Sequence, residues 1–302
     1  MIISNRISIH RIISGTWKYF LITILTCALT YLLYHYFIPN DFEIPTIVPS
    51  ILGTALAFFI GFNNNQSYDR WWEARKIWGA LVNDSRTWTR QVLFFLNSDA
   101  DKEKHLPLLR RVIFRHISFL YALKQNLRKS TDNEYKKYIS ESDISVVSSE
   151  SNKPNALLSL QTKDLNELYD SNVIDGFKFI ELNKMLINFS DEMGQSERIS
   201  NTVFPTSYSF YNHIFVWIFI VLVTLVTAQS IGAWSILAGT LIGYVFLTIH
   251  KIGQSLLNPF DNIPTGIPLN QITRTIEINM LQTLKEKVIP EQIKSVNSEY
   301  IM

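Results

Sequence analysis

Residues 44–62 read IPTIVPSILGTALAFFIGF and carry no charged side chain. Residues 63–76 follow directly, contain no Gly or Pro, and read NNNQSYDRWWEARK. As a helix, the first stretch is long enough to cross the hydrocarbon core of a bilayer, which is ~30 Å thick. The second stretch is polar, charged and rich in Trp. We therefore expect one helix that crosses the membrane and continues into water, lining a path between the two.

Four windows of the chain are nearly free of charge: Phe20–Phe37, Ile44–Phe62, Phe210–Ala228 and Ile231–His250. The remaining sequence is as charged as a soluble protein, which explains why the mean hydropathy of the chain is only +0.09. Long apolar windows separated by polar sequence are typical of transmembrane helices. The sequence predicts an all-α membrane protein with four transmembrane helices and a large aqueous helical region.

The first window also resembles the apolar part of a signal peptide, because Arg6 and Arg11 precede it. It is longer than such a part usually is, and no small-residue cleavage site follows it. Tyr34-His35-Tyr36 follows instead, as in an interfacial aromatic belt. We expect a membrane helix that is retained.

Basic residues indicate the orientation in the membrane. Residues 1–18 carry three Lys and Arg, 63–209 carry twenty, and the chain from Lys251 onward carries five. The connections 38–43 and 228–230 carry none. Basic residues concentrate on the cytosolic side of membrane proteins. Both termini and the long central segment are therefore expected in the cytosol.

These features divide the chain into four parts: residues 1–62 with the first pair of transmembrane helices, 63–209 as a cytosolic helical region, 210–250 with the second pair, and 251–302 as a cytosolic tail. Apolar spacing in the central part predicts helices over 67–97, 106–129, 162–170 and 177–195. The Ser-rich stretch 140–155 contains Pro154 and is predicted to be a surface loop. No alternating pattern predicts strands.

Several function classes find no support. A net charge of +2 without a basic stripe does not suit nucleic-acid binding. The single cysteine, Cys27, allows no disulfide framework, and the six histidines lack metal-ligand spacing. No nucleophile elbow or Gly-rich phosphate loop indicates an enzyme, so no catalytic residue, metal or cofactor is expected. No window carries a charge at mid-span, which favours a passive pore over a coupled transporter. A non-conducting membrane scaffold would show the same absence and remains the alternative.

Thr54, Phe58 and Phe62 recur every four residues, which places them on one stripe of a helix. Ile51, Ala55 and Phe59 form a neighbouring stripe of equal regularity. Spacing alone does not decide which stripe faces lipid, another helix or a pore.

Residues 51–86 read ILGTALAFFIGFNNNQSYDRWWEARKIWGALVNDSR, which resembles the second-helix signature of bestrophins, specifically their bacterial branch. Three further stretches resemble motifs of that family at consistent spacing: Glu197-Arg198 followed by Phe204-Pro205 and Tyr208, then Asn258-Pro259-Phe260, and then Pro268-Leu269-Asn270 leading into Arg274-Thr275-Ile276-Glu277-Ile278-Asn279. Residues 130–170 match nothing.

The resemblance implies a homopentamer around one central ion pore, with four membrane spans per subunit and a cytosolic helical vestibule. It also implies a hydrophobic neck whose positions lie eight, twelve and sixteen residues before Arg70. These positions are Phe62, Phe58 and Thr54. Thr54 departs from the larger aliphatic residue usual there, so the outer end of the neck is expected to be wetter.

A second constriction of the family lies 28 residues before Pro205, which is Phe177 in this chain. Without the resemblance, Phe177 would be interpreted as a core residue at the start of a helix. Asp175 has the character of an N-cap and is also placed to form an acidic ring near the cytosolic exit.

Eukaryotic members of the family hold calcium in an acidic stretch after the Asn-Pro-Phe motif. Here that stretch keeps only Asp261, and Ile263 and Gly266 occupy the other positions. Ca²⁺ needs several oxygen ligands, so no calcium switch is expected. The resemblance thus implies a channel for small monovalent ions in the bacterial plasma (inner) membrane. Chloride is the usual ion of the family, and some bacterial members conduct cations, so the sign of the ion stays open.

Overall fold

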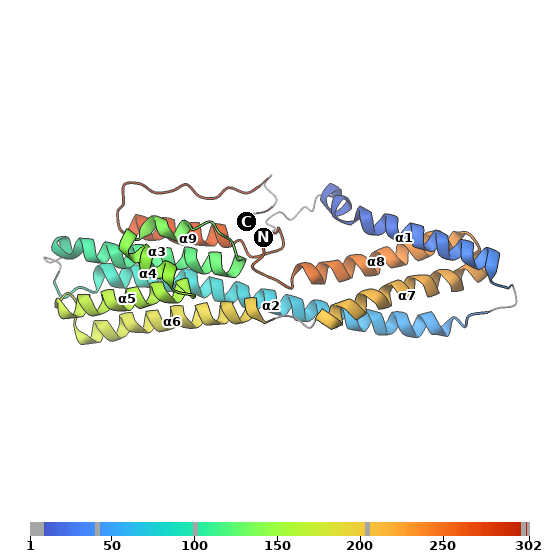
Figure 1. Ribbon diagram of the computed structural model, residues 1–302, viewed down its shortest axis with the longest axis horizontal. Coiled ribbons are helices and arrows are strands. Elements are labelled where there is room, and N and C mark those ends of the chain that lie inside the picture. Colours follow the sequence, from blue (N-terminus) through green and yellow to red (C-terminus); the bar gives the residue numbers. More distant parts are fainter. Residues whose placement is uncertain (1–8, 40–42, 99–101, 203–205, 297–299, 301–302) are drawn as a thin grey trace. The chain divides into compact units, whose positions relative to one another are not determined.

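The computed structural model describes residues 9–39, 43–98, 102–202, 206–296 and 300. Arg6 and the Phe204-Pro205 pair therefore lie outside the described residues. The helices fall into two compact units. The first, called the membrane unit, contains α1 (Ile9–Phe37), α2 (Ile47–Phe94) as far as Trp71, α7 (Thr206–Ile231) and α8 (Trp234–Ser255). Figure 1 shows these helices as long and uninterrupted.

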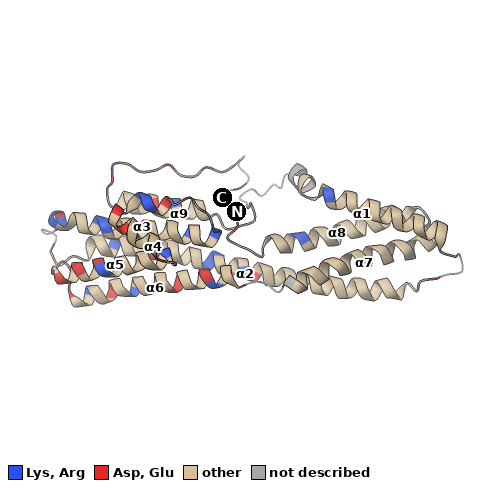
Figure 2. Cartoon of the chain, viewed as in Figure 1, with Lys and Arg blue, Asp and Glu red and all other residues tan. Residues whose placement is uncertain are grey.

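The second unit, called the charged unit, contains α2 from Trp72 onward and the chain's remaining helices. These are α3 (Lys102–Arg128), the 3₁₀ helix η2 (Glu134–Tyr138), α4 (Glu141–Ser149), α5 (Lys153–Asp170), α6 (Gly176–Asn201) and α9 (Leu269–Thr283). Figure 2 shows acidic and basic residues along these helices and few on α1, α7 and α8.

The four predicted transmembrane windows are confirmed as parts of long apolar helices. Stretches long and apolar enough to cross a membrane are Ser14–Phe37, the first part of α2, Ser207–Ile231 and Trp234–Ser255. The predicted continuity from the second window into the polar sequence is also confirmed, because α2 is one helix through the run 63–67. Within that run, the amide of Asn64 donates to the carbonyl of Ile249 at 3.1 Å.

The membrane unit packs around an apolar core of residues from all four of its helices, including Cys27, Leu56, Ile60, Val216 and Leu247. Glycines on α8 allow its neighbours to come close. A Cβ on Gly243 would lie 2.7 Å from Ile220. A Cβ on Gly253 would lie 1.8 Å from Oδ1 of Asn64. Small residues at such contacts are how membrane helices gain packing area.

The charged unit is organised around α3, which contacts α5, α6, η2 and α9. His116 of α3 is completely buried between Ser85 and Gln161, with ring nitrogens 2.9 and 3.3 Å from their side-chain oxygens. Burial lowers the pKa of His116 to about 3, so the ring is neutral. Trp88 and Phe189 pack beside it. The packing of α3 therefore depends on a satisfied core histidine rather than on a metal ligand.

A buried ion-pair network joins α3, α4 and α5. The guanidinium of Arg115 lies 2.8 Å from Oδ1 of Asp143 and 2.6 Å from Oδ1 of Asp164. Arg111 reaches the same oxygen of Asp164 at 2.9 Å. Each charge in the network therefore has an opposite charge within hydrogen-bond distance, as burial requires.

The predicted loop over 140–155 is wrong. Ser140 caps α4 by accepting a hydrogen bond from the backbone N–H of Asp143 at 3.2 Å. Val147 is buried, and Asp143 accepts hydrogen bonds from Arg115. These tertiary contacts stabilise a helix that the Ser-rich sequence alone does not predict. Pro154 stands in the first turn of α5, where proline is tolerated, instead of ending a loop.

The other predicted helices are confirmed, with different ends. The helix predicted over 162–170 begins earlier, at Lys153, and the helix predicted over 177–195 continues to Asn201. Helix α9 was not predicted; its buried face includes Ile272, Ile276 and Met280. Among the described residues the only β-type pairing is an isolated bridge between Val296 and Tyr300, in agreement with the absence of predicted strands.

Glu192 of α6 is a buried carboxyl beside other carboxylates. Burial, with smaller contributions from Asp84 and Asp191, raises its pKa to about 8. Its Oε2 atom has no hydrogen-bond partner in the described part of the chain. Because the folded state holds this proton more tightly than the unfolded chain, the contribution of Glu192 to the free energy of unfolding falls as pH rises from about 4.5 to about 8.

Replacing Arg115 is expected to destabilise the charged unit strongly. Arg115→Met leaves Asp143 without its ion-pair partner and should cost about 3–5 kcal/mol. Arg110, on the same helix, pairs with Glu286 at 2.5 Å but is half exposed. Arg110→Met should cost only about 0–1 kcal/mol. Denaturant unfolding of both detergent-purified variants measures the difference, and equal losses would show that the network adds nothing beyond a surface pair.

Removing the Glu192 charge is expected to stabilise the protein only at high pH. Near pH 5 the wild type and Glu192→Gln should melt at similar temperatures, and by about pH 9 the variant should melt several degrees higher. Glu181→Gln, an exposed change on the same helix, serves as the control and should show a flat difference. A Glu192→Gln difference that does not grow with pH would contradict the raised pKa.

Candidate pore-lining site

One stripe of α2 points away from the core of the membrane unit. Leu56 and Ile60 are in that core. At about 100° per residue, Thr54, Phe58 and Phe62 lie roughly opposite them. The side chains of Phe58 and Phe62 are 71% and 52% exposed. The chain therefore folds so that the sequence-predicted neck residues share one outward stripe.

The neighbouring stripe differs, because Phe59 has a partner on another helix of the same chain. Its ring centroid lies 6.2 Å from that of Tyr208 at the start of α7, in an edge-to-face arrangement. Phe59 also lines an apolar groove of about 440 Å³ with Tyr208, Tyr211 and Phe215. The structure thus turns Phe59 toward α7 and leaves Phe58 outside that groove. The assignment of Phe58 and Phe62 to a pore neck stays a prediction.

The hydroxyl proton of Thr54 is already used in a hydrogen bond within α2. Its hydroxyl donates to the carbonyl of Ser50, one turn earlier in α2, at 2.9 Å. The oxygen keeps its capacity to accept a hydrogen bond, but its proton is occupied. A ring of Thr54 side chains would therefore present acceptors more readily than donors.

Phe177 is 85% exposed, so its interpretation as a core residue is wrong. It is the second residue of α6, and Ile180 and Ile187 on the same side of that helix are also exposed. α6 thus carries a partly apolar stripe that the described part of the chain leaves uncovered, with the exposed Lys184 between Ile180 and Ile187. Sequence spacing alone gave no signal for this stripe, because a helix with a core face on its other side shows the same period.

The predicted N-cap role of Asp175 is confirmed. One of its carboxylate oxygens accepts hydrogen bonds from the backbone N–H groups of Phe177 and Lys178, both at 2.9 Å. The side chain of Lys178 lies 3.4 Å from the other oxygen. The hydrogen bond from the Lys178 backbone is the main reason that the pKa of Asp175 lies below its ordinary value. Asp175 is therefore ionised at neutral pH, with a positive charge beside it.

The structure brings the candidate residues together as two groups. Thr54, Phe58 and Phe62 share a stripe of α2 in the membrane unit, and Asp175 and Phe177 lie together at the start of α6 in the charged unit. No residue of either group is part of a cluster that could hold a metal. Across the described residues, no group of three His, Cys, Asp or Glu has the arrangement that a metal ion needs.

The stretch after Asn258-Pro259-Phe260 is a tight turn. The Asn258 amide donates to the Asp261 carboxylate, and the Gly266 N–H donates to the carbonyl of Ile263 at 2.9 Å. A Cβ on Gly266 would lie 2.2 Å from the carbonyl oxygen of Asp261. A side chain that could add a second carboxylate at this position has no room. Independence from calcium stays a prediction.

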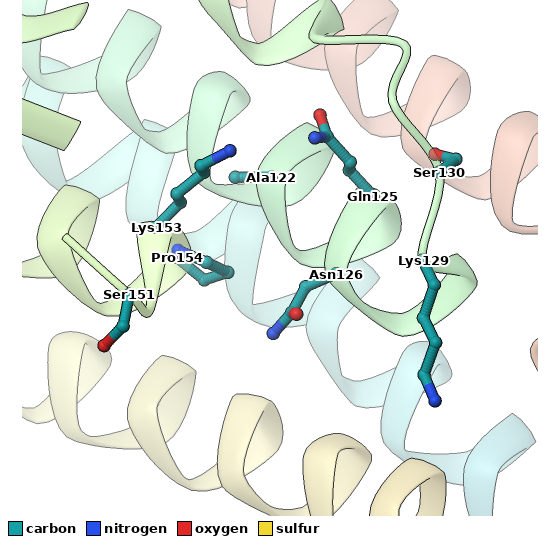
Figure 3. A pocket seen from close by; sticks show the side chains of 8 residues that line it. All are labelled: Ala122, Gln125, Asn126, Lys129, Ser130, Ser151, Lys153 and Pro154. Carbon is teal, nitrogen blue, oxygen red and sulfur yellow. The ribbon is translucent and has the colours of Figure 1, made fainter. Parts of the chain in front are cut away.

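A separate pocket of about 230 Å³ lies between the end of α3 and the start of α5, and it includes Lys129 and Lys153. Figure 3 shows these two lysine side chains pointing in opposite directions. They do not converge on one ligand position. We assign no site to this pocket.

Comparison with known proteins places this arrangement in a family. The sequence profile described as "Bacterial/Fungal Bestrophin protein" matches residues 2–282. The voltage-dependent anion channel-forming protein YneE of Escherichia coli is 30% identical over 250 residues, which covers 82% of this chain and 80% of the relative. A voltage-dependent anion channel-forming protein of Nostoc is 28% identical over 273 residues, covering 89% and 87%.

A solved structure agrees in fold. The crystal structure of a bacterial bestrophin homologue from Klebsiella pneumoniae matches with a TM-score of 0.82 at 24% identity, covering 89% of this chain and 98% of that one. The match of the profile over nearly the whole chain confirms the resemblance found in the sequence. The chain belongs to the bacterial and fungal bestrophin family.

Proposed function

We propose that this chain forms a passive ion channel, a homopentamer in the bacterial plasma membrane with both termini in the cytosol. Small monovalent ions pass a hydrophobic neck and then a cytosolic aperture. The observation that supports this most is α2, one unbroken helix that exposes Phe58 and Phe62 in a chain of the bestrophin family. Relatives of the chain are named as anion channel-forming proteins.

Self-association is supported by the exposed apolar residues on the partly apolar stripe of α6. Phe177, Ile180 and Ile187 are exposed in a unit that carries many charged residues. Exposed apolar stripes of this kind usually mark protein contacts or ligand passages. In a ring of identical subunits, one edge of each stripe would contact a neighbour while the tip at Phe177 reaches the axis.

The neck would act through the hydration of the ion. Five Phe58 and five Phe62 side chains around an axis would form a narrow apolar constriction, in which an ion loses part of its water shell. Such constrictions can close by dewetting, in which water leaves the apolar segment and ions can no longer pass. Phenylalanine rings turned edge-on present a positive rim to an anion, whereas their faces suit cations.

The aperture would act by size and charge. A single ring of Phe177 is short and filters by diameter. Asp175 lies two residues away, but Lys178 and the N-terminus of α6 offset its charge. This local balance favours neither sign of ion strongly. The proposal therefore follows the named relatives in taking anions as the main ion, with cation conduction as the alternative that a reversal potential decides.

Currents from the purified protein in planar bilayers under a KCl gradient test the proposal. Wild-type protein is expected to give currents with a reversal potential displaced from zero. Phe58→Ala and Phe62→Ala should raise conductance or open probability, because smaller side chains widen and wet the neck. Phe59→Ala is the matched control and should change little.

The opposite results are equally informative. Changes only in Phe59→Ala would mean that the other stripe of α2 lines the pore. A flat trace from protein of verified pentamer mass would favour a non-conducting scaffold. A monomer or dimer in several mild detergents would contradict the ring.

At the aperture, Phe177→Ala is expected to alter permeability ratios among ions of different size more than it alters gating. Asp175→Asn keeps the helix cap, since Asn and Asp cap about equally well, but removes the charge. It should lower cation permeability at low ionic strength, where screening is weakest. Asp175→Ala removes both the cap and the charge and should also lower the melting temperature. If Asp175→Asn leaves selectivity at low salt unaltered, Asp175 acts only as a cap.

A further inference from the structure

A groove of about 490 Å³ lies between α2 and α9, entirely within the charged unit. The residues that line it are Arg86, Thr89, Arg90 and Phe94 from α2 and Asn279, Met280, Gln282 and Thr283 from α9. Two are arginines and none is acidic. A groove of this size accommodates a small organic molecule rather than a bare ion.

These two arginines differ from most others in the same unit. Arg110, Arg111, Arg115, Arg198 and Arg274 each lie within ion-pair distance of a carboxylate. By contrast, Arg86 donates from Nε to the neutral amide oxygen of Asn279 at 2.9 Å. Arg90 donates from Nη2 to the hydroxyl of Thr87, on its own helix, at 3.1 Å. Among the described residues, neither guanidinium has an acidic partner.

The two arginines stand four residues apart on α2 and line the same groove. Positions four apart on a helix are neighbours on its surface, and like charges there destabilise the helix slightly. An anion between them would convert this repulsion into two attractions. The remaining Nη groups of both side chains provide donors in the planar geometry that matches phosphate oxygens.

The rest of the groove is suited to the organic part of such an anion. Phe94 is more than half exposed at one end of the groove, and the ammonium of Lys102 lies 4.4 Å from its ring centroid, which adds a third positive charge. Met280 is buried beneath the groove. The hydroxyls of Thr89 and Thr283 already donate to carbonyls of their own helices, so the arginines and Gln282 supply the donors.

We propose that this groove binds an organic phosphate, with the phosphate between Arg86 and Arg90 and an apolar or aromatic part against Phe94. Binding would link α9 to α2. The chemistry is the same for a soluble phosphate ester and for a lipid headgroup, so the experiment must separate the two sources.

The test uses the full-length protein in detergent, with phenyl phosphate and inorganic phosphate as probes at constant ionic strength. Calorimetry should show saturable binding, tighter for phenyl phosphate because of its ring. Arg90→Gln should weaken both probes about tenfold or more, the loss expected for a charge-assisted hydrogen-bond pair. Phe94→Leu should weaken phenyl phosphate and leave inorganic phosphate nearly unchanged.

Arg75→Gln is the matched control, because Arg75 lies on the same helix, loses the same charge and is absent from the groove. It should bind both probes like the wild type. Equal losses in Arg75→Gln and Arg90→Gln would show general charge attraction and overturn the proposal. Absence of saturable binding to the wild type in the millimolar range would also overturn it.

Two further measurements distinguish a soluble ester from a lipid headgroup and from a neighbouring subunit as the occupant of the groove. Nanodiscs of phosphatidylcholine with and without phosphatidic acid distinguish the sources: competition of phosphatidic acid with phenyl phosphate would assign the groove to lipid headgroups, and no competition would assign it to soluble esters. Measuring the oligomeric mass of Arg90→Gln tests whether a neighbouring subunit occupies the groove instead. If the variant dissociates while the wild type binds neither probe, a carboxylate of another copy occupies the groove and the ligand site is refuted. None of these readouts depends on ion conduction.

Discussion

Backbone hydrogen bonding along α2 is the constraint on which the other features depend. A chain segment in lipid must satisfy its N–H and C=O groups internally, and a helix does so without a partner. Helix α2 keeps the same backbone hydrogen bonding from Ile47 to Phe94. Only its side chains change, from apolar in the first part to polar and charged in the second. The rotation of α2 is then set by what it buries, and the burial of Leu56, Ile60 and Asn63 turns Phe58 and Phe62 outward.

A polar residue after Phe62 also helps to fix the rotation of α2 about its axis. Asn64 donates to a carbonyl of α8, and Gly253 of α8 leaves room for the Asn64 side chain. Asn63 of α2, Asn212 of α7 and His250 of α8 are also buried polar residues. The hydrogen bond from Asn64 thus adds a polar contact between α2 and α8 to the apolar packing of the membrane unit.

Much of this architecture could be predicted from the sequence, and the failures have physical causes. Hydropathy identified the membrane helices, because a charge-free run long enough to cross a bilayer is typical of a transmembrane span. It missed α4, because its stability comes from Ser140 as a cap and from the Asp143–Arg115 pair, whose members are distant in sequence. Spacing placed Phe58 on a stripe but could not say whether that stripe was covered. For the same reason, spacing without the family resemblance would interpret Phe177 as a core residue, whereas it is exposed.

Exposure has a different meaning in the two units. In the membrane unit, an outward Phe58 costs nothing in lipid, so its exposure alone does not distinguish a pore from a lipid-facing surface. In the charged unit, exposed apolar area costs roughly 25 cal/mol per Å² in water. In the proposed channel, burial of Phe177, Ile180 and Ile187 against a neighbouring subunit would therefore favour association. In the proposed ring, the charged unit would supply free energy of assembly, and the membrane unit would supply the surface that assembly turns into a pore.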